Sequence, residues 1–352
     1  MTIDLDKQGV PVAPRISIAM ATYNGERYLE DQLDSILRQT LQPYELVVSD
    51  DGSRDRTIDV VERFAQRAPF PVRVYRNEVN LGFGGNFFRA ASECRGDWIS
   101  FSDQDDLWLP TKLSDCAEAI AKTSDLAMVL QKAKLCNEKL EWGGRMIPDS
   151  IRRGTYRPRS QQVFWIWFGF LQTIPRELLS LYAADLPISY CRGVDRVTHD
   201  AWACVMANAV GKIVVIDKPA ALYRRHDAAL TGYHQQMSPS EMLRLASQVG
   251  AEHYAYMADA AASNASYLRN IIAACPRDDW AAGLVAVAQD FDRMASIQRH
   301  RADLYRGFSL LRRLRSYVSI WTSGGYIGPV VTALGTKSAV KDFAQMITGQ
   351  WS

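Results

Sequence analysis

Residues 16–39, ISIAMATYNGERYLEDQLDSILRQ, contain the two patterns that decide the fold. The first seven, ISIAMAT (16–22), form an apolar, β-prone run of the kind found in a buried strand. Beyond them, apolar residues recur at the spacing of one helix face: Leu29, Leu33, Ile36 and Leu37. The stretch therefore predicts a buried strand, a short loop and a helix.

The same alternation of strand and helix continues along the following residues. Apolar β-prone runs predict three further strands, and helical spacing predicts three further helices. The strands span 44–50, 72–77 and 97–103, and the helices span 57–66, 84–95 and 109–122. Strands that alternate with helices through short loops predict an α/β sandwich with a mostly parallel sheet.

The pattern becomes less regular after Gln131. Residues 137–160 are rich in Gly, Pro and Arg and are interpreted as a long loop, whereas the aromatic run 163–171, VFWIWFGFL, is interpreted as core. The pattern then predicts a helix, a strand and a polar loop, over 198–210, 212–217 and 223–234. From Ser238 to Gly324 the chain is predicted to be almost all helical.

These patterns divide the chain into an N-terminal arm (1–14), an α/β domain (15–235) and a mostly helical C-terminal region (236–352). The net charge of +2 gives no indication of a nucleic-acid partner. None of the six cysteines forms a C-x-x-C pair, which is typical of reduced thiols in a cytosolic protein. The first residues include Asp4 and Asp6 and contain no apolar run, so we expect no secretory signal.

Polar residues follow three of the predicted strands at the point where each strand ends. They are Thr22, Tyr23 and Asn24; Asp50 and Asp51; and Asp103, Gln104, Asp105 and Asp106. Ligands of open α/β sheets bind beyond the carboxyl ends of the strands, so these residues are expected to share one site. Taken alone, the three crowded carboxylates of the last group allow a metal site, an acid/base pair or a solvated loop.

The sequence lacks the motifs of several other kinds of binding or catalytic site. A dinucleotide-binding G-x-G-x-x-G would follow the first strand directly, where this chain has Thr22 to Gly25. The GFGG at 82–85 comes after the third strand and is interpreted as a turn and a helix start. No G-x-x-x-x-G-K-[ST] or G-x-S-x-G occurs. The D-x-D pair Asp103 and Asp105 suits a hard divalent cation, Mg²⁺ or Mn²⁺, which can neutralise a diphosphate.

At this point four segments, taken together, resemble a known family. The segments are SIAMATYNGERYLEDQLDSILRQT (17–40), ELVVSDDGSRDRT (45–57), NLGFGGNFFRA (80–90) and SFSDQDDLWLPTKL (100–113). They look like the inverting family-two glycosyltransferases with the A-type fold, and within these the bacterial rhamnosyltransferase-like branch. The resemblance extends over roughly residues 15 to 233 and makes 15–235 the expected catalytic domain.

The resemblance implies a nucleotide-diphosphate sugar donor, with TDP-rhamnose as the leading guess. Thr22, Tyr23 and Asn24 would line the nucleoside pocket, and Asp50 would contact the base with Asp51 beside it. Asp103 would hold the ribose or belong to the metal shell, and Asp105 would bind the Mg²⁺ or Mn²⁺. The remaining residues assigned to donor binding from these motifs are Asn80, Gly82, Gln104, Asp106 and Lys112.

The resemblance also implies a general base on the acceptor side. The His199-Asp200 pair in VTHDAWACVM offers Asp200, which would take the proton of the acceptor hydroxyl. The alternative is that Asp200 is only an acid in the first turn of a helix, favourable through the helix dipole. LYRRHDAALTG (222–232) resembles the closing loop of the family, in which Arg224 would pair with the diphosphate and His226 would be a further metal ligand.

The C-terminal region has a charge pattern of its own. From Leu304 to Lys341 there are six basic residues and no acidic ones. Several apolar residues are expected near one helical face: Leu304, Phe308, Leu311, Val318 and Trp321. Residues 317–336 are uncharged, but they are rich in Gly and hydroxyl residues. This composition does not favour a helix that spans a membrane. Such a helix lies on an anionic membrane surface, or packs on its own catalytic domain or on a second subunit.

The expected acceptor is a growing bacterial surface polysaccharide such as O-antigen, held on a lipid carrier. Such an acceptor places the enzyme in the cytoplasm or at the inner face of the cytoplasmic membrane. A homo-oligomer remains open. The alternative function is a catalytically silent sugar-nucleotide-binding subunit of a polysaccharide assembly complex. The presence of the H-D pair and the D-x-D motif argues against this alternative.

Overall fold

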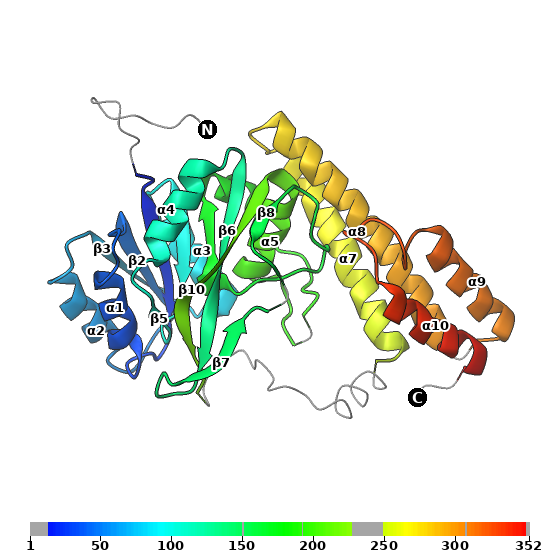
Figure 1. Cartoon of the computed structure of the whole chain (residues 1–352), viewed down its shortest axis with the longest axis horizontal. Helices are drawn as coiled ribbons and strands as arrows, with labels where there is room; N and C mark the ends of the chain where they lie inside the picture. The colour runs from blue at the N-terminus through cyan, green and yellow to red at the C-terminus, as the bar shows by residue number, and fades with distance from the viewer. Residues whose placement is uncertain (1–12, 150, 192, 227–248, 307, 350–352) are drawn as a thin grey trace. The chain divides into compact units, whose positions relative to one another are not determined.

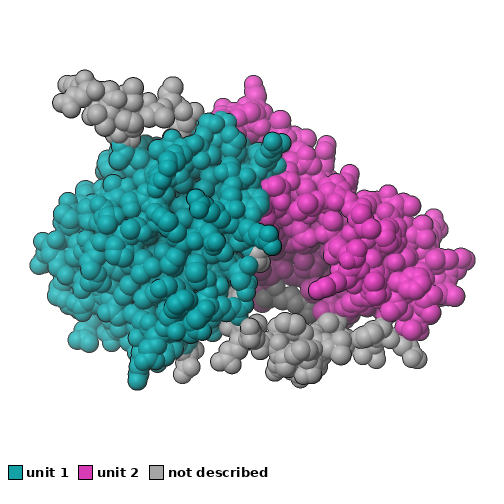
Figure 2. Space-filling model, viewed as in Figure 1, with its two compact units in different colours: residues 1–158, 166–182, 198–229 teal, residues 159–165, 183–197, 230–352 magenta. Residues whose placement is uncertain are grey.

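The computed structural model describes residues 13–149, 151–191, 193–226, 249–306 and 308–349 (Figure 1). The chain forms two compact units, shown in teal and magenta in Figure 2. Unit 1 contains Met1–Pro158, Ile166–Tyr182 and Thr198–Ala229, and unit 2 contains Arg159–Trp165, Ala183–Val197 and Leu230–Ser352. The boundary expected near residue 235 lies outside the described residues.

Unit 1 is built on one sheet with the strand order β3-β2-β1-β4-β9-β6-β10-β5, to which β7 is added on β6 and β8 on β10 (Figure 1). The strands are β1 (Ile16–Thr22), β2 (Glu45–Asp50), β3 (Val72–Arg76), β4 (Trp98–Ser102), β5 (Leu107–Trp108), β6 (Leu126–Cys136), β7 (Trp142–Ile147), β8 (Gly154–Tyr156), β9 (Gln172–Pro175) and β10 (Lys212–Arg224). The four predicted N-terminal strands are confirmed.

Helices and short 3-10 turns connect the strands of unit 1. They are α1 (Leu29–Leu37), α2 (Thr57–Ala65), α3 (Gly82–Ser92), α4 (Lys112–Lys122), α5 (His199–Val210), and the 3-10 helices η1 (Gly169–Leu171) and η2 (Arg176–Leu181). Each of the five predicted helices is confirmed within a few residues. The sheet core is apolar, since Ile18, Met20, Val47 and Ile99 are fully buried. The aromatic run 163–171 supplies further core through Trp167 and Phe170, as expected.

The sheet contains two parallel parts, β3-β2-β1-β4 and β6-β10, which antiparallel strands join and extend. β1 to β4 pair in parallel, but β9 lies antiparallel between β4 and β6. The predicted loop 137–160 contains β7 and β8, which return to the sheet as antiparallel strands. β6 was not predicted from the sequence, because the polar residues Gln131, Lys132 and Lys134 interrupt its apolar run. The first two are nevertheless buried by tertiary contacts.

Unit 2 is helical over α7 (Ala251–Ile272), α8 (Asp278–Tyr305), α9 (Leu310–Thr322) and α10 (Thr336–Thr348). The prediction of a helical region from Ser238 to Gly324 is confirmed for its described residues, and α10 extends it, whereas residues 238–248 lie outside the described part of the chain. The single apolar face expected from Leu304 to Trp321 is wrong, because the helix ends at Tyr305 and a new one begins at Leu310. Leu304 is buried in α8, whereas Leu311, Val318 and Trp321 are exposed on α9.

A buried ion pair ties α10 to α8. Arg301 donates to both oxygens of Asp342, at 2.8 and 3.1 Å, and Asp342 is completely buried. Tyr305 and Tyr326 donate their hydroxyls to the same carboxylate at 3.0 and 2.9 Å. A buried charge is tolerated when its oxygens are saturated in this way, and it becomes costly when one partner is removed.

We predict that Asp342→Ala destabilises unit 2 by about 3–5 kcal/mol, because the Arg301 guanidinium would stay buried without its counter-ion. Hydrogen exchange in peptides from α8 and α10 measures the loss. The matched control is Asp292→Ala, which removes an exposed partner of Arg269 and should cost less than about 1 kcal/mol. Equal protection in the two variants would show that the buried pair does not stabilise unit 2.

Candidate active site

Three of the polar strand ends lie on one edge of the sheet. β1 is paired in parallel with β2 on one side and with β4 on the other, so the carboxyl ends of all three point the same way. Thr22 lies opposite Asp50 in the register, and Met20 lies opposite Ser102. The loops that carry the predicted site residues therefore begin side by side, as ligand sites of open α/β sheets require.

Asp50 organises its own loop. It is almost fully buried and accepts hydrogen bonds from the Thr22 hydroxyl at 2.9 Å, the Ser53 amide at 2.9 Å and the Ser53 hydroxyl at 2.5 Å. These donors compensate the charge of the carboxylate and connect the end of β1 with the end of β2. A direct contact between Asp50 and a nucleobase, as predicted, would have to replace one of these bonds.

Asp51 holds the start of α3. Its carboxylate accepts from the Leu81 amide at 2.7 Å, the Gly82 amide at 2.9 Å and the Asn77 side-chain amide at 3.0 Å. Asn80 completes the arrangement, because it donates to the Asp51 carbonyl at 3.1 Å and accepts from the Gly82 amide. Gly82 has a φ of +72°, a conformation that favours glycine. The GFGG motif is thus a turn followed by a helix start, as expected.

The loop after β1 is linked to the acidic loop through Gln104. The Gln104 side chain accepts from the Tyr23 amide at 2.9 Å and donates to the Tyr23 carbonyl at 3.1 Å. A Cβ on Gly25 would lie 2.3 Å from the Gln104 Oε1 atom, so glycine is required for this contact. Tyr23 and Asn24 are exposed and can reach a ligand, whereas Thr22 is buried.

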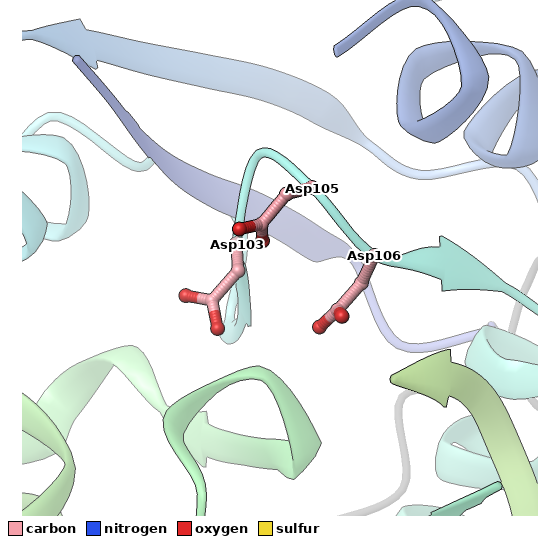
Figure 3. A group of neighbouring side chains, drawn as sticks. All are labelled: Asp103, Asp105 and Asp106. Carbon is pink, nitrogen blue, oxygen red and sulfur yellow. The ribbon is translucent and has the colours of Figure 1, made fainter. Parts of the chain in front are cut away.

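The acidic loop between β4 and β5 brings Asp103, Asp105 and Asp106 together (Figure 3). One oxygen from each lies within 4.8 Å of the others. Asp103 and Asp106 extend from the loop toward the same side, and Asp105 turns toward Asp103 (Figure 3). Asp103 and Asp105 are partly exposed, while Asp106 is fully buried. This arrangement concentrates negative charge that the described side chains compensate only in part.

The electrostatics of the acidic loop reflect this crowding. Although Asp103 is partly exposed, the protein atoms around its carboxyl group shield it from water and raise its pKa, and the charges of Asp105 and Asp200 raise it further. Burial likewise raises the pKa of Asp106, with added repulsion from Asp105 and Asp103. Asp106 accepts from the Arg224 amide at 3.2 Å, but its Oδ2 atom has no hydrogen-bond partner among the described residues. Carboxylates in this state suit a bound cation, which would favour their charged forms.

His226 and Arg224, at the end of β10, both contact the acidic loop. The His226 Nε2 atom lies 2.8 Å from Asp105 Oδ2, so these two predicted metal ligands are neighbours. The Arg224 side chain is buried and donates to the Asp105 carbonyl, the Glu138 carbonyl and the Asp31 carboxylate, at 2.9, 3.0 and 2.8 Å. Pairing of Arg224 with a diphosphate, as predicted, would require some of these bonds to open. The rest of the expected closing loop, 227–232, lies outside the described residues.

Lys112 lies in the interior rather than at the surface of the site. It is fully buried, and its ammonium group donates to the Gln131 side chain at 3.1 Å and to the Phe170 carbonyl at 2.9 Å. The Trp108 ring lies 4.6 Å away, and burial lowers the pKa of Lys112 to about 8. In this structure Lys112 is held inside unit 1 by Gln131, Phe170 and Trp108 and does not reach solvent.

Asp200 and His199 lie in the first turn of α5 and have different surroundings. Asp200 is partly exposed, and its Oδ1 atom accepts from the Thr198 hydroxyl and from the Ala201 amide, the latter at 2.9 Å. Asp200 is therefore an acid in the first turn of a helix, which is the alternative role that the sequence analysis left open for it. Its charge also raises the pKa of Asp103, which places Asp200 within electrostatic range of the acidic loop.

His199 is fully buried against aromatic rings. Its ring stacks on Phe87 with centroids 3.9 Å apart and lies 4.8 Å from Phe101. Neither ring nitrogen has a hydrogen-bond partner among the described residues, and burial lowers the pKa of His199 to about 4. A Cβ on Gly169 would lie 2.4 Å from the Nε2 atom, so this glycine leaves room for the histidine.

The sequence analysis missed two contacts of the site, those of Tyr28 and Thr198. The Tyr28 ring lies 4.7 Å from the His226 ring and 4.6 Å from the Arg224 guanidinium, so it contacts both. Thr198 orients the proposed base through its hydroxyl. A threonine directly before a helix start is a recognisable signal for a cap. Nothing in the sequence indicates the long-range contact of Tyr28.

We predict that burial of His199 makes unit 1 less stable in mild acid. The unfolded histidine takes up a proton below a pH of about 6.5, whereas the folded one does so only near its lowered pKa of about 4. Stability is therefore lost as the pH falls through this window, on the order of 1–2 kcal/mol between about pH 7 and about pH 5. Hydrogen exchange in β1 and α5 peptides measures the loss.

His199→Leu should reduce this loss of protection between the two pH values. His300→Gln, on a partly exposed histidine of α8, is the control and should keep the pH dependence of the wild type. If His199→Leu loses as much protection as the wild type does, the acid sensitivity has another origin.

Comparison with known proteins shows what the chain is similar to. Residues 17–175 match the model of the family described as Glycosyl transferase family 2. An uncharacterized glycosyltransferase of Nostoc is 27% identical over 218 residues, which are 61% of this chain and 66% of the relative. The dTDP-rhamnosyl transferase RfbG of Shigella flexneri is 28% identical over 218 residues, 59% of this chain and 72% of that protein.

An uncharacterized protein of Mycobacterium tuberculosis is 34% identical over 217 residues, 60% of this chain and 59% of the relative. The matches to the Nostoc and mycobacterial relatives thus span less than two thirds of their lengths.

Among solved structures, S. aureus TarS 1–349 in complex with UDP is similar with a TM-score of 0.52 and 20% identity, covering 96% of this chain and 92% of the TarS 1–349 chain. Its complex with UDP-GlcNAc gives a TM-score of 0.50 at 20% identity, covering 83% of this chain and 91% of the TarS 1–349 chain. Residues 17–175 of this chain are thus similar to glycosyl transferase family 2, and the chain has the A-type glycosyltransferase fold.

Proposed function

We propose that this protein is a metal-dependent, inverting glycosyltransferase that uses a nucleoside-diphosphate sugar. The observation that carries the proposal is the cluster of Asp103, Asp105 and Asp106 at the end of β4, within electrostatic range of Asp200. The similarity to a dTDP-rhamnosyl transferase supports dTDP-rhamnose as the donor. The exposed Tyr23 and Asn24 are the residues best placed to contact the nucleoside.

The acidic loop fits a divalent ion by the chemistry of its donor atoms. Hard cations such as Mg²⁺ and Mn²⁺ prefer carboxylate oxygens, and Mn²⁺ also accepts imidazole nitrogen. Asp105, Asp103 and His226 would hold the ion, and the contact of Asp105 with His226 supports this set. When bound, the ion supplies positive charge to the diphosphate.

Asp200 serves as the general base in this proposal. Its carboxylate takes the proton of the acceptor hydroxyl while that oxygen bonds to the anomeric carbon. The bond from the anomeric carbon to the diphosphate oxygen breaks on the opposite face, so the nucleoside diphosphate leaves and the configuration inverts. The Thr198 hydroxyl and the Ala201 amide keep the carboxylate oriented for this step.

The resemblance of the sequence to polysaccharide-assembling transferases supports a lipid-linked bacterial surface polysaccharide, such as O-antigen, as the acceptor. We place the enzyme accordingly at the cytoplasmic face of the inner membrane. The alternative is a sugar-nucleotide-binding subunit without activity. Donor binding without turnover on any acceptor would favour this alternative.

The activity is tested by release of nucleoside diphosphate from dTDP-rhamnose, with UDP-GlcNAc and GDP-mannose as comparison donors. We predict that Asp200→Asn lowers kcat about 10²- to 10⁴-fold, because the amide cannot accept the proton, and leaves donor affinity nearly unchanged. Asp59→Asn, an exposed acid on α2, is the control and should keep full activity. Turnover of the wild-type rate in Asp200→Asn would contradict the assignment of the base.

The metal assignment has its own test. We predict that EDTA stops turnover and that Asp105→Asn raises the Mn²⁺ concentration for half-maximal activity by about tenfold or more, because a charged ligand is lost. Glu118→Gln, on the exposed side of α4, should leave the Mn²⁺ requirement unchanged. Full activity of the wild type in EDTA would remove the metal from the proposal.

A further inference from the structure

Unit 2 carries an exposed apolar surface on its last two helices. Of the eighteen large hydrophobic residues that are exposed in the described chain, ten lie between Leu310 and Ile347. On α9 they follow one helix face: Leu311, Leu314, Val318 and Trp321. On α10 they do the same: Val340, Phe343 and Ile347. Contiguous exposed apolar surface of this kind marks an interaction site.

The two rows meet and form one surface. The Phe343 ring of α10 lies 5.7 Å from the Tyr317 ring of α9. Tyr317 follows Leu314 by three residues and precedes Trp321 by four, so it shares their helix face, and its ring lies 6.4 Å from the Trp321 ring. We refer to the two rows together with Tyr317 as the α9–α10 face.

The charges around the α9–α10 face have one sign. Residues 308–349 contain five basic residues and a single acid, Asp342, which is buried and paired with Arg301. Arg315 follows Leu311 by one helical turn, and Lys337 precedes Val340 by three residues, so both exposed cations border the apolar rows. A second copy of the chain would bring the same cations toward this face, and like charges would repel.

We propose that the α9–α10 face lies on an anionic lipid surface. Apolar side chains enter the boundary between headgroups and acyl chains, while arginine and lysine at the border contact the anionic headgroups. Trp321 suits this boundary, where tryptophan is enriched. In the described part of the chain no helix has the length and hydropathy needed to cross a bilayer. This inference stands apart from the proposed catalytic function.

Flotation of the full chain with vesicles tests the proposal. We expect binding to vesicles of phosphatidylcholine with phosphatidylglycerol, and at least about tenfold weaker binding to phosphatidylcholine alone or when salt is raised from about 0.1 M to about 1 M. Val318→Asp with Phe343→Asp should abolish binding. Val285→Asp, at an exposed apolar position of α8, is the matched control and should bind like the wild type.

A second pair of variants tests the cations that border the α9–α10 face. Arg315→Glu with Lys337→Glu should weaken binding by about tenfold or more, because two attractive charges become repulsive. Arg293→Glu with Arg299→Glu, on exposed positions of α8, should retain it. Hydrogen exchange over α8 confirms that each variant is folded.

Three outcomes would overturn the proposal. The first is the absence of binding to anionic vesicles. The second is vesicle binding that neither pair of α9–α10 variants reduces. The third is a dimer in light scattering that Val318→Asp with Phe343→Asp dissociates, without vesicle binding, which would assign the face to a second copy.

Discussion

Repulsion among carboxylates at the ends of parallel strands is the constraint on which this site depends. The fold brings five aspartates to one edge of the sheet, and each needs positive partial charge close by. Asp50 and Asp51 obtain it from backbone amides and from serine, threonine and asparagine side chains. Asp103, Asp105 and Asp106 obtain much less, so negative potential remains concentrated in the loop after β4.

This difference suits the two groups of aspartates to different roles. A saturated carboxylate shapes the chain around it, and here Asp51 fixes the start of α3 while Asp50 joins the ends of β1 and β2. An unsaturated group attracts a ligand of opposite charge. From the sequence motifs alone both groups were assigned to ligand binding. The motifs contain no information on which carboxylates accept hydrogen bonds from donors within the protein.

Much of the fold was predictable because it depends on local periodicity. The apolar runs of β1 to β4 and the repeating leucines of α1 are readable within a few residues of sequence. In the second half of the sheet the start of β10 was predictable, but β6 was not, because Gln131 and Lys132 look exposed in the sequence and are buried only by contacts with distant residues. The interior positions of Arg224 and Lys112 depend on Asp31, Glu138 and Phe170, which lie far away along the chain.

Gln104 has a consequence for how the site responds to a ligand. Its amide holds both backbone groups of Tyr23, and it lies in the chain between Asp103 and Asp105. A displacement of the acidic loop must therefore either carry Tyr23 with it or break two hydrogen bonds. The nucleoside side and the diphosphate side of the proposed pocket are mechanically coupled through one side chain, and ordering of either loop reduces the conformational freedom that the other still has to lose.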